Sequence, residues 1–211
     1  MTDFEKAKNY VYTKLEKELA RNLYYHGIHH TRDDVLPAAE RLAGLEGVLG
    51  EDLLLLRTAA LYHDIGYVET YSKNEPIAVR IASETLPVFG YSKGQIESIS
   101  SIIMATQVYF LDGKLIQKPD ENDILQKIIC DADLDSLGRD DFFVVCDNLR
   151  RELGDYGIKK SLRKWYEDEI VFLENHNYFT KAARLLKNDV KLRNLEEIKY
   201  LLHGQEAKLA S

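Results

Sequence analysis

Apolar residues recur at helical spacing along almost the whole chain, and this pattern restricts the fold more than any other feature. In residues 3–25 one stripe of the expected helix is apolar and consists of Phe4, Val11, Leu15, Leu19 and Leu23. Residues 51–64 are apolar nearly all round, which is typical of a helix buried in the centre of a bundle. Sustained alternation of apolar and polar residues, the pattern of a half-buried strand, is absent. The sequence therefore predicts an all-α helical bundle in which any sheet is limited to a stray bridge.

The expected helices follow one another without a visible domain boundary. Their approximate ranges are 3–25, a second beginning near 31, 51–64, 77–89, 93–107, 121–136, 141–153, 160–175, 180–186 and 195–203. Thr31 is the expected N-cap of the second helix, because Asp33 and Asp34 follow in the first turn, where carboxylates suit the helix dipole. Residues 109–120 are the one expected long loop. No low-complexity linker or repeat interrupts the chain, so we expect a single domain over residues 1–211, with a motif-bearing core of about 24–139 and C-terminal helices in 140–211.

The acidic balance of the chain argues against several classes of partner. The 211 residues carry a formal net charge of −7, so nothing draws the whole surface toward nucleic acid or an anionic membrane. An anionic substrate would need a local positive centre, which a bound metal ion can supply. The N-terminal residues are polar and acidic, unlike a signal peptide, and no apolar run is long enough to span a bilayer. We therefore expect a cytoplasmic protein in which Cys130 and Cys146 are buried thiols rather than a disulfide.

Four short stretches stand out from the rest of the sequence: residues 24–31, 59–66, 99–106 and 129–138. His63 and Asp64 end a helix otherwise built of leucine and alanine, where a charged carboxylate is costly unless it is paired or binds a cation. Asp131 and Asp133 pose the same problem inside another apolar run. Carboxylates buried in two separate helices are explained if they converge on one metal ion.

Each of these features also has an explanation without a function. A lone His-Asp pair is most often a hydrogen-bonded pair in the core or on the surface. An Asp-Ala-Asp sequence is often a solvated helix face, and a Tyr-His pair such as Tyr25-His26 commonly satisfies its polar atoms locally. Taken singly, each stretch favours that interpretation. Their order along the chain and their apolar surroundings favour a shared site.

The order of these motifs resembles the HD superfamily of metal-dependent phosphohydrolases, in which a histidine, a His-Asp pair and an aspartate follow one another. Residues 25–31 (YHGIHHT) resemble the first signature of the family, and residues 60–66 (ALYHDIG) resemble the central one. Residues 131–134 (DADL) resemble the closing signature. The resemblance implies an all-α fold of the HD-domain type.

The resemblance also implies which side chains hold the metal: His30, His63, Asp64 and Asp133. Asp131 is the alternative to Asp133. Two imidazole nitrogens and two carboxylate oxygens suit Mn, Fe, Co, Ni or Mg better than ions that prefer thiolates. Two histidines that help to bind a second metal in binuclear members are replaced here by Asn74 and Thr106. We therefore expect one divalent metal ion.

The implied activity is hydrolysis of a small phosphorylated metabolite, which we expect to be a nucleotide, by metal-activated water. Asp64 is expected to accept the proton of that water. The candidates for protonating the leaving oxygen are His26, Lys73 and Glu75. The candidate phosphate-binding residues are Arg57, Arg139 and Lys73.

Two alternatives belong to other classes of protein. A catalytically degenerate HD module would bind metal or nucleotide as a sensor or scaffold, and the loss of histidine at Asn74 and Thr106 favours it somewhat. A purely structural helical protein is the third hypothesis. It does not account for carboxylates inside apolar helices.

Overall fold

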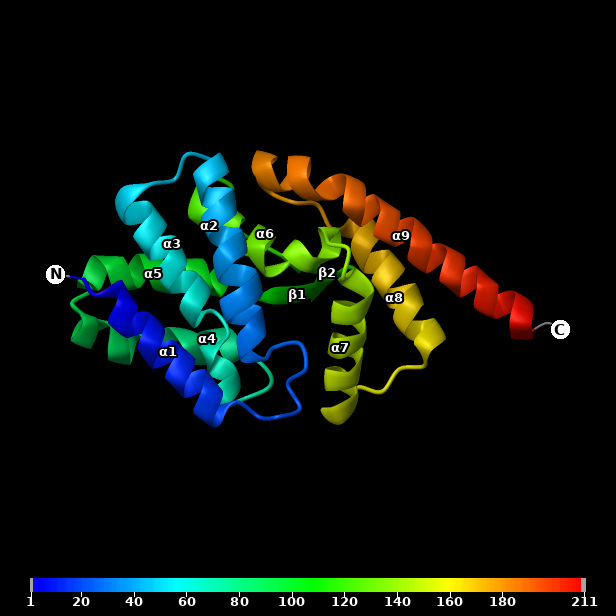
Figure 1. Ribbon diagram of the computed structural model, residues 1–211, viewed down its shortest axis with the longest axis horizontal. Helices are drawn as coiled ribbons and strands as arrows, with labels where there is room; N and C mark the ends of the chain where they lie inside the picture. The colour runs from blue at the N-terminus through cyan, green and yellow to red at the C-terminus, as the bar shows by residue number, and fades with distance from the viewer. Residues whose placement is uncertain (1, 210–211) are drawn as a thin grey trace.

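The computed structural model describes residues 2–209 of the chain and the side chains of residues 2–203 (Figure 1). In this range the α-helices are α1 (Phe4–Glu18), α2 (Leu36–Leu45), α3 (Gly50–Tyr62), α4 (Asn74–Thr85), α5 (Lys93–Ala105), α6 (Ile124–Asp133), α7 (Phe142–Asp155), α8 (Leu162–Asn175) and α9 (Lys181–Leu209). Short helical turns, η1 (His30–Val35), η2 (Ile65–Val68), η3 (Leu86–Phe89) and η4 (Asp135–Gly138), join several of them. The predicted all-α class is confirmed, with one small sheet added.

Side-chain caps fix where several helices begin. Asp3 accepts a hydrogen bond from the backbone N–H of Lys6 at the start of α1. Ser92 and Gln95 form a reciprocal capping box at the start of α5. Such caps satisfy backbone donors that have no partner inside the helix. The first turns of these helices are therefore encoded locally.

Helix α3 lies at the centre of the N-terminal part of the molecule, where α1, α2, α5 and α6 contact it. Its second half is buried on all sides, as the sequence predicted. The resulting hydrophobic core consists of residues from α1 through α6 together with Tyr178, Ala182 and Ala183 near the start of α9. A helix packed on every side is a rigid support. The residues that follow Tyr62 are therefore held in place by the core.

The last three helices form a second hydrophobic cluster on the side of the molecule away from the N-terminus (Figure 1). Its members include Phe142 and Cys146 of α7, Trp165 of α8 and Ile198 of α9. Helix α9 packs along α8 and against η4. Among residues 2–209, no helix is both long enough and apolar enough to cross a membrane.

The prediction of two separate helices at 180–186 and 195–203 is wrong, because α9 runs through both without a break. The intervening residues are polar, but the structure gives their side chains internal partners. Asn194 donates hydrogen bonds to the carbonyls of Leu137 and Arg139, and the ammonium of Lys191 donates to the carbonyl of His176. A polar stretch can continue a helix when its side chains bind neighbouring backbone in this way.

The predicted long loop at 109–120 is also wrong for most of its length, because residues 108–117 form an antiparallel hairpin of β1 (Val108–Leu111) and β2 (Lys114–Gln117). Asp112 and Gly113 form the turn with φ angles of 50° and 79°. An Asp-Gly pair is favoured where both central residues need positive φ. The Asp112-Gly113 pair is a hairpin signal in the sequence. The expectation that any sheet would be limited to a stray bridge is therefore wrong. The hairpin ends with the buried side chain of Gln117.

His176, between α8 and α9, gives the fold an expected dependence on pH. The side chain is buried, and within the described residues neither ring nitrogen has a hydrogen-bond partner. Burial, with a smaller contribution from the Lys191 cation, lowers the pKa of His176 from 6.5 to about 3. Below pH 6.5 the unfolded chain therefore binds a proton at His176 that the folded chain does not bind, so stability falls as the pH falls. As the pH falls from 6.5 to 5, His176 is expected to lower the free energy of unfolding by about 2 kcal/mol.

Replacing His176 with Phe keeps an aromatic ring beside Tyr178 and removes the titration. The loss of unfolding free energy from pH 6.5 to pH 5, measured by urea unfolding, should then be about 2 kcal/mol smaller than in the wild type. His203→Phe, at an exposed position on α9, is the control and should keep the wild-type loss. Equal losses in the wild type and His176→Phe would contradict the prediction.

Candidate metal centre

Three segments bring the predicted ligands together at one end of the central core. His63 caps the C-terminus of α3, and Asp64 follows it directly. Gly66 then allows a close approach, since a Cβ atom at this position would lie 2.0 Å from the carbonyl oxygen of Asn74. Turn η1 supplies His30, and the last residue of α6 is Asp133. The chain turns directly after Asp64, and glycine is required in this turn.

The two imidazoles and the two carboxylates lie within contact distance of one another. Nε2 of His30 is 3.1 Å from Oδ1 of Asp133, and Nε2 of His63 is 3.2 Å from Oδ2 of Asp64. The crossed pairs, His30 with Asp64 and His63 with Asp133, are each separated by 3.6 Å. His30, His63 and Asp64 are buried, and each offers a ligand atom within 4.8 Å of the others. Asp133 completes the group from the opposite helix.

Two atoms of this group fit a bound cation. Nε2 of His63 and Oδ2 of Asp64 are buried and have no hydrogen-bond partner within the described residues, which is uncommon for buried polar atoms. Nδ1 of His63 lies 2.8 Å from the carbonyl oxygen of Ala60. An N–H on Nδ1 would donate to that carbonyl, which leaves the lone pair of Nε2 free to bind a metal. The residues present therefore suit a divalent cation.

Without a cation these groups hold one another as ion pairs. Burial opposes the charged form of His63, but the Asp64 carboxylate beside it raises its pKa from 6.5 to about 9. Burial alone would raise the pKa of Asp64, whereas His63, His26 and His30 lower it below its usual value. A cation that binds here must displace the proton of His63, so binding is expected to release protons.

Gln117 is a contact that the sequence did not reveal. Its amide donates hydrogen bonds to Oδ2 of Asp133 at 2.8 Å and to the carbonyl of Thr106 at 3.0 Å. The carboxylate of Asp133 is thereby fixed from the β-hairpin. Only the turn signal at Asp112-Gly113 could have placed this residue on a strand near the site.

Glu152 of α7 is the second functional contact that sequence reasoning missed. Its buried carboxylate accepts hydrogen bonds from the backbone N–H groups of Tyr25 and His26, at 2.7 and 3.0 Å. It also contacts Nδ1 of His26 and accepts from the hydroxyl of Tyr71 at 3.2 Å. Burial disfavours a charged imidazole, but Glu152 together with the charges of Asp64 and Asp133 raises the pKa of His26.

These contacts also explain why the predicted helix over 3–25 is too long. The backbone donors of Tyr25 and His26 bind a side chain from α7 instead of helix carbonyls, and α1 ends at Glu18. The second predicted helix does begin near Thr31, as the π-helical turn η1, and continues as α2 from Leu36. Thr31 lies inside η1, so its expected role as the N-cap is wrong. Such turns are frequent at functional sites.

The other predicted residues are divided between the site and the surface. Glu75 lines the same pocket as Asp64, and burial together with the charges of Asp64 and Asp133 raises its pKa. Lys73 precedes α4 in a left-handed conformation, is exposed and does not line this pocket. Its proposed roles as acid and phosphate ligand receive no support from this position.

Arg57 does not lie at the site. Its guanidinium pairs with Glu40 at 2.6 Å and lies 4.2 Å from the centre of the Phe4 ring, and Arg57 does not line the pocket at the site. Arg139 is closer, but it is shared between the carboxylates of Asp34 and Asp141. Arg139 is connected to the site through Asp34, whose carboxylate is 4.0 Å from Nδ1 of His30.

Asp131 faces away from the predicted ligands. Its two carboxylate oxygens accept hydrogen bonds from the backbone of Phe179 and from the backbone and hydroxyl of Thr180, at 2.7 to 2.8 Å. Asp131 therefore anchors the chain just before α9. This position gives no support to the alternative in which Asp131 replaces Asp133 at the site.

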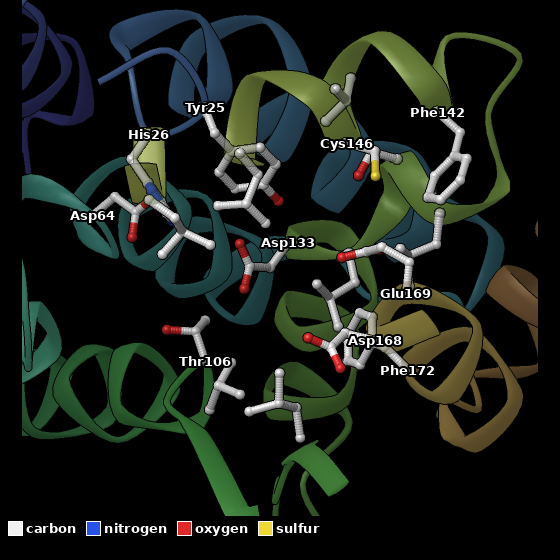
Figure 2. A pocket seen from close by; sticks show the side chains of 18 of the residues that line it. Tyr25, His26, Asp64, Thr106, Asp133, Phe142, Cys146, Asp168, Glu169 and Phe172 are labelled. Carbon is white, nitrogen blue, oxygen red and sulfur yellow. The ribbon is translucent and has the colours of Figure 1, made fainter. Parts of the chain in front are cut away.

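The site opens into a pocket of about 370 Å³ (Figure 2). Asp64 and His26 lie toward one end of it, Glu169 and Phe172 of α8 lie toward the other, and Asp133 lies between them. Asn74 and Thr106 line the same space. The hydroxyl of Thr106 donates a hydrogen bond to the carbonyl of Ile103, at 2.8 Å.

The helical fold and the buried group of imidazoles and carboxylates define a class of protein, an all-α protein with a candidate site for a divalent cation. The sequence profile of the HD domain matches residues 27–136, just over half of the chain. The chain therefore belongs to the HD-domain family, and the predicted resemblance is confirmed. HD domains bind divalent metal ions. Searches of curated proteins and of solved structures each returned no match.

Proposed function

We propose that the protein is a metal-dependent phosphohydrolase acting on a small phosphorylated metabolite, for which a nucleotide is the expected class. The observation that carries the proposal is a pair of buried atoms, Nε2 of His63 and Oδ2 of Asp64, that have no hydrogen-bond partner among the described residues and lie at the end of a substrate-sized pocket. We assign four side chains as ligands of one Mn, Fe, Co, Ni or Mg ion: His30, His63, Asp64 and Asp133.

The proposed roles of the other residues follow from their contacts. The bound ion would activate a water and offset charge on the phosphoryl group. Asp64 is the proposed proton acceptor. His26 is the proposed proton donor, since Glu152 orients its ring and favours its protonated form. Glu75, whose raised pKa also favours a protonated side chain, is the second candidate.

The charges of the pocket favour one phosphate group over several. Among the described residues that line it, Lys160 is the one with a lysine or arginine side chain, and it is paired with Asp168 at 2.7 Å. Arg139 is already shared between two carboxylates. A single phosphoryl group can be offset by the metal ion, whereas further phosphates would meet carboxylates. We therefore propose a phosphomonoester as the substrate.

We further propose that residues 1–211 work as one domain. The pocket is lined by residues of η2, α4 and α6 on one side and of α7 and α8 on the other. The C-terminal helices would therefore form part of the binding site. Glu152 supports this proposal, because it orients His26 from outside the residues matched by the HD profile.

The test combines metal analysis with a substrate screen. The purified protein should contain one tightly bound metal ion per chain, because an Asn amide and a Thr hydroxyl are weak ligands and little charge is left to offset a second cation. With that metal it should hydrolyse phosphomonoesters in a panel of phosphorylated metabolites, and a chelator should abolish the activity.

The other outcomes separate the alternatives. Two metals per chain at full occupancy would overturn the single-metal assignment. Metal binding without turnover of any phosphate ester would favour a degenerate module that serves as a sensor or scaffold. If the protein bound no metal and hydrolysed no phosphate ester, a purely structural role would be favoured.

A further inference from the structure

The pocket continues beyond the candidate metal centre into a lobe between α7 and α8. We call it the distal lobe and define it by Phe142, Val145, Leu149, Trp165, Glu169 and Phe172. All but Glu169 are apolar or aromatic, and Phe142 and Trp165 are buried. Figure 2 places Phe142, Glu169 and Phe172 on one side of the pocket, with Asp64 and His26 on the opposite side. A molecule that fills the pocket would meet polar atoms at the metal centre and apolar walls beyond it.

Glu169 places a carboxyl group on the α8 wall of the distal lobe, close to the Lys160–Asp168 ion pair that also lines the pocket. Glu169 lies beside the Cys146 thiol, whose sulfur accepts a hydrogen bond from the Trp165 indole at 3.0 Å. The lysines on this side of the pocket pair with another carboxylate, because Lys160 and Lys164 each lie 2.7 Å from Asp168. Within the described residues no cation pairs with Glu169. Burial raises the pKa of its carboxyl group to about 7, which is expected for an acid without a partner charge.

We propose that the distal lobe binds the organic part of the substrate, and that this part is a flat apolar ring whose far edge donates an N–H hydrogen bond to Glu169. A nucleobase with an exocyclic amino group has this chemistry. The proposal rests on the proposed function, because it assumes that the phosphate lies at the metal centre. Apolar walls favour the ring faces, and the carboxyl group of Glu169 disfavours a second anionic group at that end.

Two phosphomonoesters that differ in one amino group test the role of Glu169: adenosine 5′-monophosphate and purine riboside 5′-monophosphate. The wild type should prefer the amino-bearing ester by about tenfold or more in kcat/KM, since a substrate without the donor takes water from the carboxyl group of Glu169 without replacing its hydrogen bond. In Glu169→Leu the ratio should fall to near one. Glu169→Gln, which keeps an acceptor oxygen, should retain part of the preference.

Glu167→Leu is the matched control, because Glu167 pairs with Arg163 on the same helix and does not line the pocket. It should keep the wild-type ratio. Unchanged discrimination in Glu169→Leu, or no preference in the wild type, would overturn the assignment of Glu169.

A second pair of variants tests the lobe itself. Leu149→Trp would fill the distal lobe, and kcat/KM for adenosine 5′-monophosphate relative to phenyl phosphate should fall by about 100-fold. Leu162→Trp, at an exposed position on α8, should leave this ratio unchanged. An unchanged ratio in Leu149→Trp would place the ring elsewhere.

Phenyl phosphate separates this proposal from the proposed function. If the wild type hydrolyses phenyl phosphate but not the nucleoside monophosphates, the lobe proposal fails and the phosphohydrolase assignment stands. If it hydrolyses neither with metal present, both fail.

Discussion

Asp64→Ala is expected to release the bound metal and to lower kcat/KM for phosphomonoester hydrolysis by about 10³-fold or more. The substitution removes one proposed ligand and the proposed proton acceptor together, and a positioned base alone contributes about 10²–10⁴-fold. Elemental analysis and steady-state kinetics of the purified variant measure the two losses. The fold should persist, because His63 can lose its proton once the neighbouring carboxylate is gone.

Asp147→Ala is the control for this experiment, since Asp147 pairs with Arg150 near the surface of α7 and does not line the pocket. It should keep both the metal and the activity. If Asp64→Ala kept stoichiometric metal, the ligand assignment would be wrong. A far-UV circular dichroism spectrum like that of the wild type would show that any loss is not due to unfolding.

Glu152→Ala is expected to lower the free energy of unfolding by about 3–5 kcal/mol. The substitution removes the acceptor of two backbone N–H groups, at Tyr25 and His26, and of the Tyr71 hydroxyl. It also leaves the imidazole of His26 without its partner. For a chain of this length the change corresponds to a decrease in Tm of about 10 °C, measurable by calorimetry.

Glu84→Ala provides the comparison, because Glu84 accepts hydrogen bonds only from Arg80 on an exposed face of α4. Its effect should stay below about 1 kcal/mol. A loss of similar size in both variants would mean that the Glu152 contacts add little. Glu152→Ala should also reduce activity in any fraction that remains folded, since His26 loses its orientation.

Much of the fold could be predicted because its determinants are local. Apolar spacing predicted most helices, and α3 is buried as its composition indicates. The residues of the motifs are also brought together: His30, His63, Asp64 and Asp133 lie within 3.1 to 3.6 Å of one another in pairs. Their roles as ligands remain a proposal.

The contacts that the sequence did not reveal join residues far apart in the chain. Glu152 is an ordinary glutamate on an amphipathic helix until the fold places it under Tyr25 and His26. Gln117 reaches Asp133 only through the hairpin. Arg57 illustrates the reverse case. Its helix was placed correctly, but its side chain faces Glu40, because spacing from His63 alone does not fix the face that a residue occupies.

The two aspartates at the end of α6, Asp131 and Asp133, have different partners and different proposed roles. On the proposed assignment Asp133 serves the reaction, whereas Asp131 holds the backbone of Phe179 and Thr180 so that α9 can start. Natural selection would then act on them separately. In a descendant without catalytic activity, Asp133 could be substituted without loss of function. Asp131 would still be retained as long as α9 packed against the rest of the fold.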